Sequence, residues 1–167
     1  MSGSQAAPVS RLGLMAYALA LVTVMLDQAS KAWVVNVLHL DDRGSVPVLP
    51  PFFRLTLVEN RGISFGWLRA ETPLGRWALV AAAFTLIIFL IAWVRKADRW
   101  LFATAIGLII GGALGNNLID RAGIGRVIDF LDFSGFYFPW VFNVADSAIS
   151  VGVALLFVDM LTAPKSL

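Results

Sequence analysis

The sequence predicts an all-α membrane bundle of four transmembrane helices. Hydrophobic residue types make up 59% of its 167 residues and charged types only 14%, whereas a soluble domain carries about a quarter charged residues. Four apolar runs each approach the ~20 residues that cross a bilayer as a helix, and together they use about half of the chain. We therefore expect residues 1–167 to form a single integral membrane domain with small extramembrane segments.

The composition also excludes several kinds of site. The chain contains no cysteine, which excludes disulfides, thiolate catalysis and cysteine metal sites. Its single histidine, His39, excludes a zinc site of the two-histidine helical type, and we interpret His39 as an ordinary interfacial residue. A net charge of +2 is too small to indicate a nucleic-acid partner.

The first predicted span covers about residues 12–35. Its apolar start after Arg11 resembles the core of a signal peptide, but the run continues past Asp27 and Lys31 and therefore indicates an uncleaved span. Because Asp27 and Lys31 are four residues apart, they share one helix face and are able to form an ion pair.

The first extramembrane segment covers about residues 39–72. Residues 52–58 are rich in aromatic and β-branched types and predict a short strand, and a turn-rich stretch containing Gly62 and Gly66 begins at Asn60. Three prolines just before the strand, Pro47, Pro50 and Pro51, break any helix there.

Residues 77–94 and 100–119 form the second and third predicted spans. The short connection between them, residues 95–99, predicts an antiparallel hairpin. The third span carries glycines at a spacing that lets helices approach closely; they are Gly107, Gly111, Gly112 and Gly115.

Residues 120–142 form the second extramembrane segment, and residues 144–163 form the fourth span. An even number of spans places both termini on one side of the membrane. The loop 95–99 holds three cations and favours the cytoplasm for that side, although eight of the 13 cations lie on the other side. We follow the short loop and predict cytoplasmic termini.

Two aspartates stand out in this weakly charged chain. Asp129 lies in the second extramembrane segment, and Asp146 opens the fourth span, where an ionisable group is costly and indicates a functional site. The 16 residues between them are enough to fold back. At ~4 Å, two carboxylates repel by about 4 kcal/mol at an effective dielectric of 20, which is roughly three pKa units. One carboxyl then stays protonated and polarises a carbonyl, while the other takes a proton from water. The alternative is that each aspartate caps a helix or pairs with an arginine.

Further polar residues lie near these aspartates. Asparagine both donates and accepts hydrogen bonds, which suits the binding of a peptide backbone; the candidates are Asn60, Asn117 and Asn143. Helix capping is the alternative for Asn117, Asp120 and Asn143, and we interpret Asn116 as a cap. Arg121 is expected to hold Asp120 or Asp129 in place.

Five short segments together carry a resemblance to a known family. They are residues 27–31 (Asp-Gln-Ala-Ser-Lys), 60–65 (Asn-Arg-Gly-Ile-Ser-Phe), 111–121 (Gly-Gly-Ala-Leu-Gly-Asn-Asn-Leu-Ile-Asp-Arg), 127–130 (Val-Ile-Asp-Phe) and 142–147 (Phe-Asn-Val-Ala-Asp-Ser). In this order they resemble the lipoprotein signal peptidases (signal peptidase II), which are bacterial intramembrane aspartic proteases. Each segment is weak alone, but the ordered set spans nearly the whole chain.

The resemblance implies a four-helix bundle in the bacterial inner membrane, with a small extracytoplasmic β-sheet and a short flap helix. It implies that Asp129 and Asp146 form a catalytic dyad at the outer leaflet edge, without a metal or organic cofactor. The implied substrates are prolipoproteins, cleaved just before a cysteine that carries diacylglycerol. Membrane lipid is the other implied partner, and no obligate protein partner is inferred. Supporting polar positions are implied at Asp27, Lys31, Asn60, Asn117, Asp120, Arg121 and Asn143.

One departure from the family pattern leaves an assignment open. The family usually has Gly-Asn, then two residues, then Asp-Arg, but this sequence holds one extra residue. Counting back from Asp120 selects Asn117, whereas counting forward from Gly115 selects Asn116.

Asp120 also competes with Asp129 as the partner of Asp146. We favour Asp129 because the family pattern assigns it, and because Arg121 gives Asp120 a structural partner.

Two other classes of function compete with the peptidase. In a proton-coupled transporter or channel, membrane acids relay protons, but this chain is short, lacks an internal repeat and gathers its acids at one membrane edge. In a non-catalytic assembly or lipid-binding protein, the glycines of the third span would form an oligomer seam.

Overall fold

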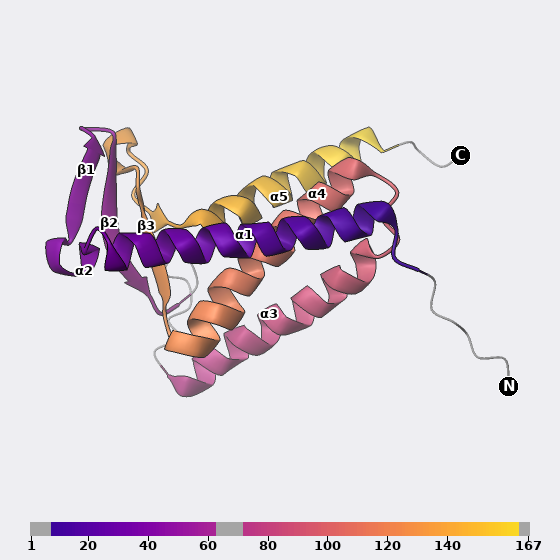
Figure 1. The fold of residues 1–167 in the computed structure, drawn as a ribbon, viewed down its shortest axis with the longest axis horizontal. Helices are drawn as coiled ribbons and strands as arrows, with labels where there is room; N and C mark the ends of the chain where they lie inside the picture. The colour runs from indigo at the N-terminus through magenta and orange to yellow at the C-terminus, as the bar shows by residue number, and fades with distance from the viewer. Residues whose placement is uncertain (1–7, 63–71, 164–167) are drawn as a thin grey trace, which may run out of the picture.

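The computed structural model describes residues 8–62 and 72–163, in which four long helices lie together and a small sheet stands at one end of the bundle (Figure 1). Each helix is long and apolar enough to cross a membrane. They are α1 (Arg11–Asn36), α3 (Pro73–Val94), α4 (Trp100–Ala113) with its continuation η2 (Leu114–Ile124), and α5 (Val144–Thr162). The predicted membrane bundle of four helices with a small sheet is confirmed.

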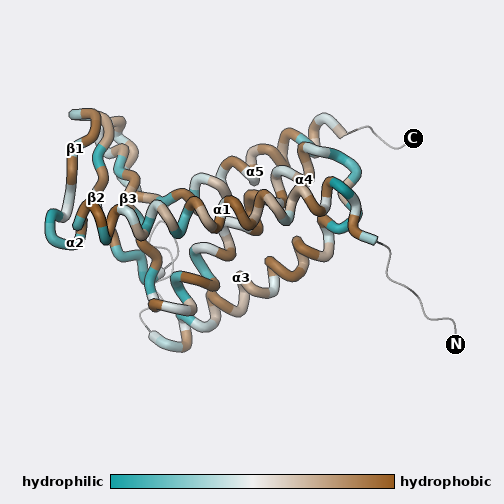
Figure 2. Tube along the Cα trace, viewed as in Figure 1, coloured by the Kyte–Doolittle hydropathy of each residue, from teal (hydrophilic) through white to brown (hydrophobic). Residues whose placement is uncertain are grey.

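The third span is the central helix of the bundle. In its most apolar window 67% of the residues are buried, against 22–28% in the other three spans. Hydrophobic residues run along the middle of the helices, and hydrophilic residues gather at both ends of the bundle (Figure 2). α1 begins and α5 ends at the end opposite the sheet (Figure 1).

Local sequence explains where the helices begin. Ser10 accepts a hydrogen bond from the Gly13 N–H over 3.0 Å and caps α1. Thr72 caps α3 in the same way, and Pro73 fits the first turn because it needs no hydrogen-bond acceptor for its nitrogen. α3 therefore begins four residues before the expected residue 77.

The third span also ends later than expected, at Ile124 rather than residue 119. Its last part, η2, is a π-helix, which holds more residues in each turn than an α-helix. Asp120 and Arg121 lie inside the helix because their side chains find partners within the protein. The helix ends at Gly125, whose φ of 84° favours glycine.

The sheet has four antiparallel strands in the order β1-β2-β3-β4. They are β1 (Ser45–Leu49), β2 (Phe53–Asn60), β3 (Val127–Asp132) and β4 (Val141–Phe142). The strand predicted at 52–58 corresponds to β2. β1 was not predicted because it contains Pro47, which an edge strand tolerates. β3 and β4 lie in the second extramembrane segment, where the sequence pattern predicted no strand.

Two short helices accompany the sheet. α2 (Leu40–Arg43) adjoins β1, and the 3-10 turn η3 (Ser134–Phe136) connects β3 to β4. α2 provides the short helix expected beside the sheet. Gly66, in the turn-rich stretch after Asn60, lies outside the described residues.

Two hydrophobic clusters hold the sheet and the bundle in place. One fills the space between the helices, and the other joins the end of α1 to the sheet through Val34, Leu40, Leu55 and Phe130. α4 and α5 approach closely at Gly112, where an added Cβ would lie 2.4 Å from the Ala145 carbonyl oxygen. This packing fixes the start of α5 against the third span, below the sheet.

Candidate active site

Asp129 lies in the middle of β3, opposite Val58 of β2. It is buried, with 3% of its surface exposed. Both of its carboxyl oxygens accept hydrogen bonds: Asn60 donates to Oδ2 over 3.1 Å and Asn143 donates to Oδ1 over 2.7 Å. Antiparallel pairing places Asn60 diagonally across from Asp129, within side-chain reach.

Asp146 lies in the first turn of α5. Asn143 caps this helix and forms a reciprocal capping box with Asp146. The Asp146 N–H donates to Asn143 Oδ1 over 2.9 Å, and the Asn143 N–H donates to Asp146 Oδ2 over 3.2 Å. Asn116 of η2 donates its side-chain amide to Asp146 Oδ1 over 2.8 Å.

Asn143 therefore connects the two aspartates. Its side-chain nitrogen binds Asp129, and its backbone nitrogen binds Asp146. Among the described residues, no hydrogen bond joins the two carboxyls directly. A fully buried asparagine thus joins the sheet to the start of α5.

The environment of Asp129 favours its protonated form. Burial raises the pKa of Asp129 from 3.8 to about 7, and the charge of Asp146 contributes to the rise. Hydrogen bonds from Asn60 and Asn143, and the charge of Lys31, act in the opposite direction. A carboxyl with this pKa exchanges its proton near neutral pH, which suits a general acid or base.

A buried ammonium group lies beneath the aspartates. Lys31 Nζ is 2.7 Å from Asp27 Oδ2, 2.7 Å from Asp120 Oδ2 and 2.8 Å from Asn116 Oδ1. The ion pair predicted between Asp27 and Lys31 is confirmed. Three acceptors match the three donors of an ammonium group, so every N–H of the buried Lys31 ammonium has a hydrogen-bond partner.

Asp27 and Gln28 tie this cluster to the rest of the bundle. Asp27 Oδ1 accepts the N–H of Ala145 over 3.0 Å, which links α1 to the first turn of α5. Gln28 donates to both Asp27 and Asp120 over 3.0 Å. Gly115 leaves the necessary space, since a Cβ there would lie 2.7 Å from Asp27 Oδ2. Sequence reasoning did not select Gln28, although it lies between two selected positions.

The two neighbouring asparagines of η2 have different partners. Asn116 binds Asp146 and also accepts hydrogen bonds from Lys31 and Asn143. Asn117 donates to the Ala113 carbonyl over 3.3 Å and accepts from Arg121. The interpretation of Asn116 as a helix cap is wrong, because the helix continues to Ile124 and keeps this side chain inside the bundle.

The hydrogen-bond partners of Arg121 also differ from those predicted. Its guanidinium donates to the Asn117 side chain and to the Gly62 carbonyl oxygen. None of its hydrogen bonds to described residues reaches Asp120 or Asp129, although its charge lies near both. Asp120 pairs with Lys31 instead, and Arg121 holds Gly62, just after the end of β2.

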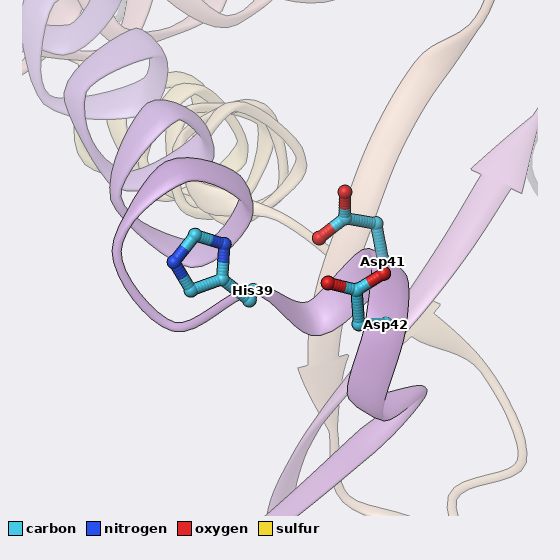
Figure 3. A group of neighbouring side chains, drawn as sticks. All are labelled: His39, Asp41 and Asp42. Atoms are coloured by element: carbon cyan, nitrogen blue, oxygen red, sulfur yellow. The ribbon is translucent and has the colours of Figure 1, made fainter.

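His39 lies apart from this site, next to two exposed aspartates at α2 (Figure 3). The potential ligand atoms of His39, Asp41 and Asp42 lie within 4.8 Å of one another. All three residues are exposed, and such surface groups commonly occur without a bound ion. We therefore interpret His39 as an ordinary surface residue.

Comparisons with known proteins agree on one family. The sequence model of a family described as signal peptidase (SPase) II matches residues 19–162. The lipoprotein signal peptidase of Caulobacter vibrioides is 55% identical over 151 residues, which cover 90% of this chain and 89% of that protein. The lipoprotein signal peptidase of Beijerinckia indica is 46% identical over 88% of this chain and 87% of its own.

Solved structures show the same fold. A structure described as a bacterial membrane enzyme, at 2.3 Å resolution, matches with a TM-score of 0.76 and 26% sequence identity. The match covers 98% of this chain and 99% of that one. A second such structure, at 1.9 Å, also has a TM-score of 0.76, with 28% identity over 96% of this chain and 100% of that one.

Proposed function

The chain belongs to the signal peptidase II family of aspartic peptidases, and from this premise we propose that Asp129 and Asp146 are its catalytic dyad. We propose further that it removes signal peptides from prolipoproteins by cleaving just before a cysteine that carries diacylglycerol. The transporter or channel alternative receives no support from the comparisons.

One observation carries the proposal. Asp129 and Asp146 come from different elements, a strand and a helix, and both bind the same buried asparagine, Asn143. They lie where the sheet meets the apolar bundle, so the lipid of a substrate remains in the bilayer while the scissile amide reaches a polar site.

The two carboxyls differ in their hydrogen-bond partners, and we assign their protonation states from this difference. Asp146 accepts hydrogen bonds from Asn116 and from the Asn143 N–H at a helix N-terminus, where an anion is stabilised. Asp129 is buried in a strand, and its pKa of about 7 keeps the proton available at neutral pH. Ionised Asp146 then takes a proton from the attacking water, and protonated Asp129 polarises the scissile carbonyl.

Hydrolysis then follows a balanced sequence. Water oxygen bonds to the carbonyl carbon as Asp146 accepts a water proton, and Asp129 donates its proton to the carbonyl oxygen. The resulting gem-diol breaks its C–N bond as Asp146 donates its proton to the leaving nitrogen and the Asp129 carboxylate takes back one hydroxyl proton to form the new carboxylic acid. The released acid and amine leave the two carboxyls sharing one proton again.

Most of the other selected polar residues act through the dyad rather than on the substrate. Asn60 and Asn143 orient Asp129, while Lys31 with Asp27 and Asp120 holds Asn116 against Asp146. Arg121 instead binds the Asn117 side chain and the carbonyl of Gly62, just after the end of β2.

The proposal includes an orientation in the bacterial inner membrane, with cytoplasmic termini and the site at the outer leaflet edge. The three cations of loop 95–99 support it. Because the chain contains no cysteine, single cysteines at exposed Lys96 and exposed Arg43 offer a direct test. A membrane-impermeant thiol reagent added to intact spheroplasts should label the second and spare the first; the reverse pattern would overturn the orientation.

The substrate assignment is tested with purified protein in detergent. A prolipoprotein carrying diacylglyceryl-cysteine and the same protein without the lipid are incubated with the enzyme, and the products are mapped by mass spectrometry. We expect one cut, immediately before the modified cysteine, in the lipidated substrate alone. Equal cleavage of both substrates would contradict the lipid requirement.

A further inference from the structure

A pocket rich in arginine lies outside the aspartate site, at the same end of the bundle. It has a volume of about 380 Å³, within the ~300–1,000 Å³ of typical ligand pockets. It is formed where β2 ends, α3 begins and η2 passes into β3. Its lining includes Arg61, Thr72, Pro73, Arg76, Gly125 and Arg126.

Positive charges outnumber negative charges among the described residues that line this pocket or pair with its lining. Glu59 pairs with Arg61 over 3.4 Å and with Arg126 over 3.0 Å, so one carboxylate serves two guanidinium groups. Arg76 has no carboxylate partner among the described residues. The positive end of the α3 dipole adds to the field, because Thr72 and Pro73 form the start of that helix.

Arg76 is held rigidly in the wall of the pocket. Its Nε donates to the Arg121 carbonyl over 2.7 Å and its Nη2 donates to the Ala122 carbonyl over 2.6 Å. Its Nη1 lies against Gly125, where an added Cβ would approach within 2.9 Å. A guanidinium fixed in this way loses little freedom when it binds a ligand.

Exposed apolar side chains lie in the pocket lining, at Ile124, and next to the lining residues Pro73 and Arg76 in α3. Leu74 is 81% exposed, Trp77 is 53% exposed and Ile124 is 54% exposed. Trp77 also lies beneath the Arg76 guanidinium, at 5.2 Å. Since α3 is a membrane span, these side chains lie where acyl chains begin, at the level that tryptophan favours in membrane proteins.

We propose that this pocket binds the phosphodiester headgroup of an anionic phospholipid. The arginine guanidinium groups donate charge-assisted hydrogen bonds to the phosphate oxygens, and the acyl chains lie along Leu74, Trp77 and the start of α3. The pocket differs from the proposed substrate site, because neither Asp129 nor Asp146 lines it, and its proposed ligand carries a phosphate that diacylglyceryl-cysteine lacks. The inference therefore does not depend on the proposed peptidase activity.

The test measures lipid binding to delipidated protein in a non-ionic detergent. Short-chain phosphatidylglycerol and phosphatidylcholine are titrated by calorimetry into wild type, the R61Q/R126Q double variant and the R43Q/R54Q double variant. Arg43 and Arg54 are exposed on α2 and β2, so the control removes the same charge outside the lining residues. Arg61→Gln alone, at a side chain 66% exposed, covers the case in which the double variant fails to fold.

We expect phosphatidylglycerol to bind wild type roughly tenfold or more tightly than phosphatidylcholine, and R61Q/R126Q to lose roughly tenfold or more of that affinity. Arg61→Gln should lose several-fold and R43Q/R54Q less than about twofold. Equal binding of the two lipids, or wild-type affinity in Arg61→Gln, would overturn the proposal. If inorganic phosphate binds as tightly as phosphatidylglycerol, the lipid assignment is wrong.

Discussion

The side-chain amide of Asn143 donates to the carboxyl of Asp129 over 2.7 Å. Asn143 is also the N-cap of α5 and binds the backbone and carboxyl of Asp146. A residue that begins a helix thus also sets the position of a carboxyl on a neighbouring strand. Capping and catalysis were alternative interpretations of Asn143 in the sequence, and the geometry allows one side chain to serve both.

The two asparagines of η2 should differ in their effect on activity. Asn116→Ala removes a hydrogen bond to the Asp146 carboxyl, so we expect cleavage to fall by roughly 10- to 100-fold, the size of a lost bond to a charged group. Asn117→Ala removes contacts to Ala113 and Arg121 and should cost less than about fivefold. Initial cleavage rates on a lipidated prolipoprotein measure both effects. A larger loss of rate in Asn117→Ala than in Asn116→Ala would contradict the assignment of Asn116 as the partner of Asp146.

Stability should depend on pH through Asp129. Its pKa is about 7 in the folded protein and 3.8 as an unperturbed group, so between these values the folded state binds more protons than the unfolded state. Stability therefore decreases as pH rises through this window, by a total on the order of 4 kcal/mol. Asp129→Asn cannot titrate and should not show this loss.

The measurement is the melting temperature of both proteins in detergent from pH 4 to 8. The excess stability of Asp129→Asn over wild type should grow up to about pH 7 and then stay constant. If the stability difference between the two proteins does not change over this pH range, the pKa of Asp129 is not raised in the folded protein.

Removing the Lys31 ammonium should destabilise the protein strongly. Lys31→Met leaves Asp27 and Asp120 buried without their shared cation, and breaking such a pair costs about 3–5 kcal/mol. Lys31→Met combined with Asp120→Asn should recover part of the loss, because one uncompensated charge is removed. Lys96→Met, at an exposed position, should change stability by less than about 0.5 kcal/mol. Equal melting temperatures for Lys31→Met and Lys96→Met would contradict the claim that Lys31 compensates the buried charges of Asp27 and Asp120.

A methyl group at the closest helix contact should separate α4 from α5. A Cβ at Gly112 would lie 2.4 Å from the Ala145 carbonyl oxygen, next to Asp146. We expect Gly112→Ala to lower stability by about 1–3 kcal/mol and to reduce cleavage. Gly123→Ala meets nothing within 4 Å and should be neutral or stabilising by up to about 1 kcal/mol. The melting temperatures of the two variants are compared with that of wild type. If both substitutions change stability equally, the close approach of α4 to α5 at Gly112 is not the cause.

Hydropathy and spacing predicted the features that depend on local sequence. The four spans follow from apolar runs, and the Asp27–Lys31 pair follows from helix periodicity. The end of the third span was missed because its polar residues look like a helix terminus. Their partners, Lys31 and Arg76, come from other helices and cannot be read from residues 114–124.

The choice between Asn116 and Asn117 depended on backbone geometry. The family pattern has one residue fewer than residues 115–121, and counting from its two ends gave two answers. A π-helix turn holds an extra residue, so η2 accommodates both asparagines and turns them toward different partners. Helix type is not visible in the sequence, and neither is the short β3 strand that carries Asp129.

The most direct test of the dyad is cleavage by Asp129→Asn and Asp146→Asn. Each variant is purified in detergent, its melting temperature is compared with wild type, and single-turnover cleavage of a lipidated prolipoprotein is followed by mass spectrometry. If the two carboxyls activate water together, each variant should remain folded and lose roughly 1,000-fold or more of the rate, since each lacks one of two groups that act as a unit. A folded variant that cleaves at the wild-type rate would contradict the assignment.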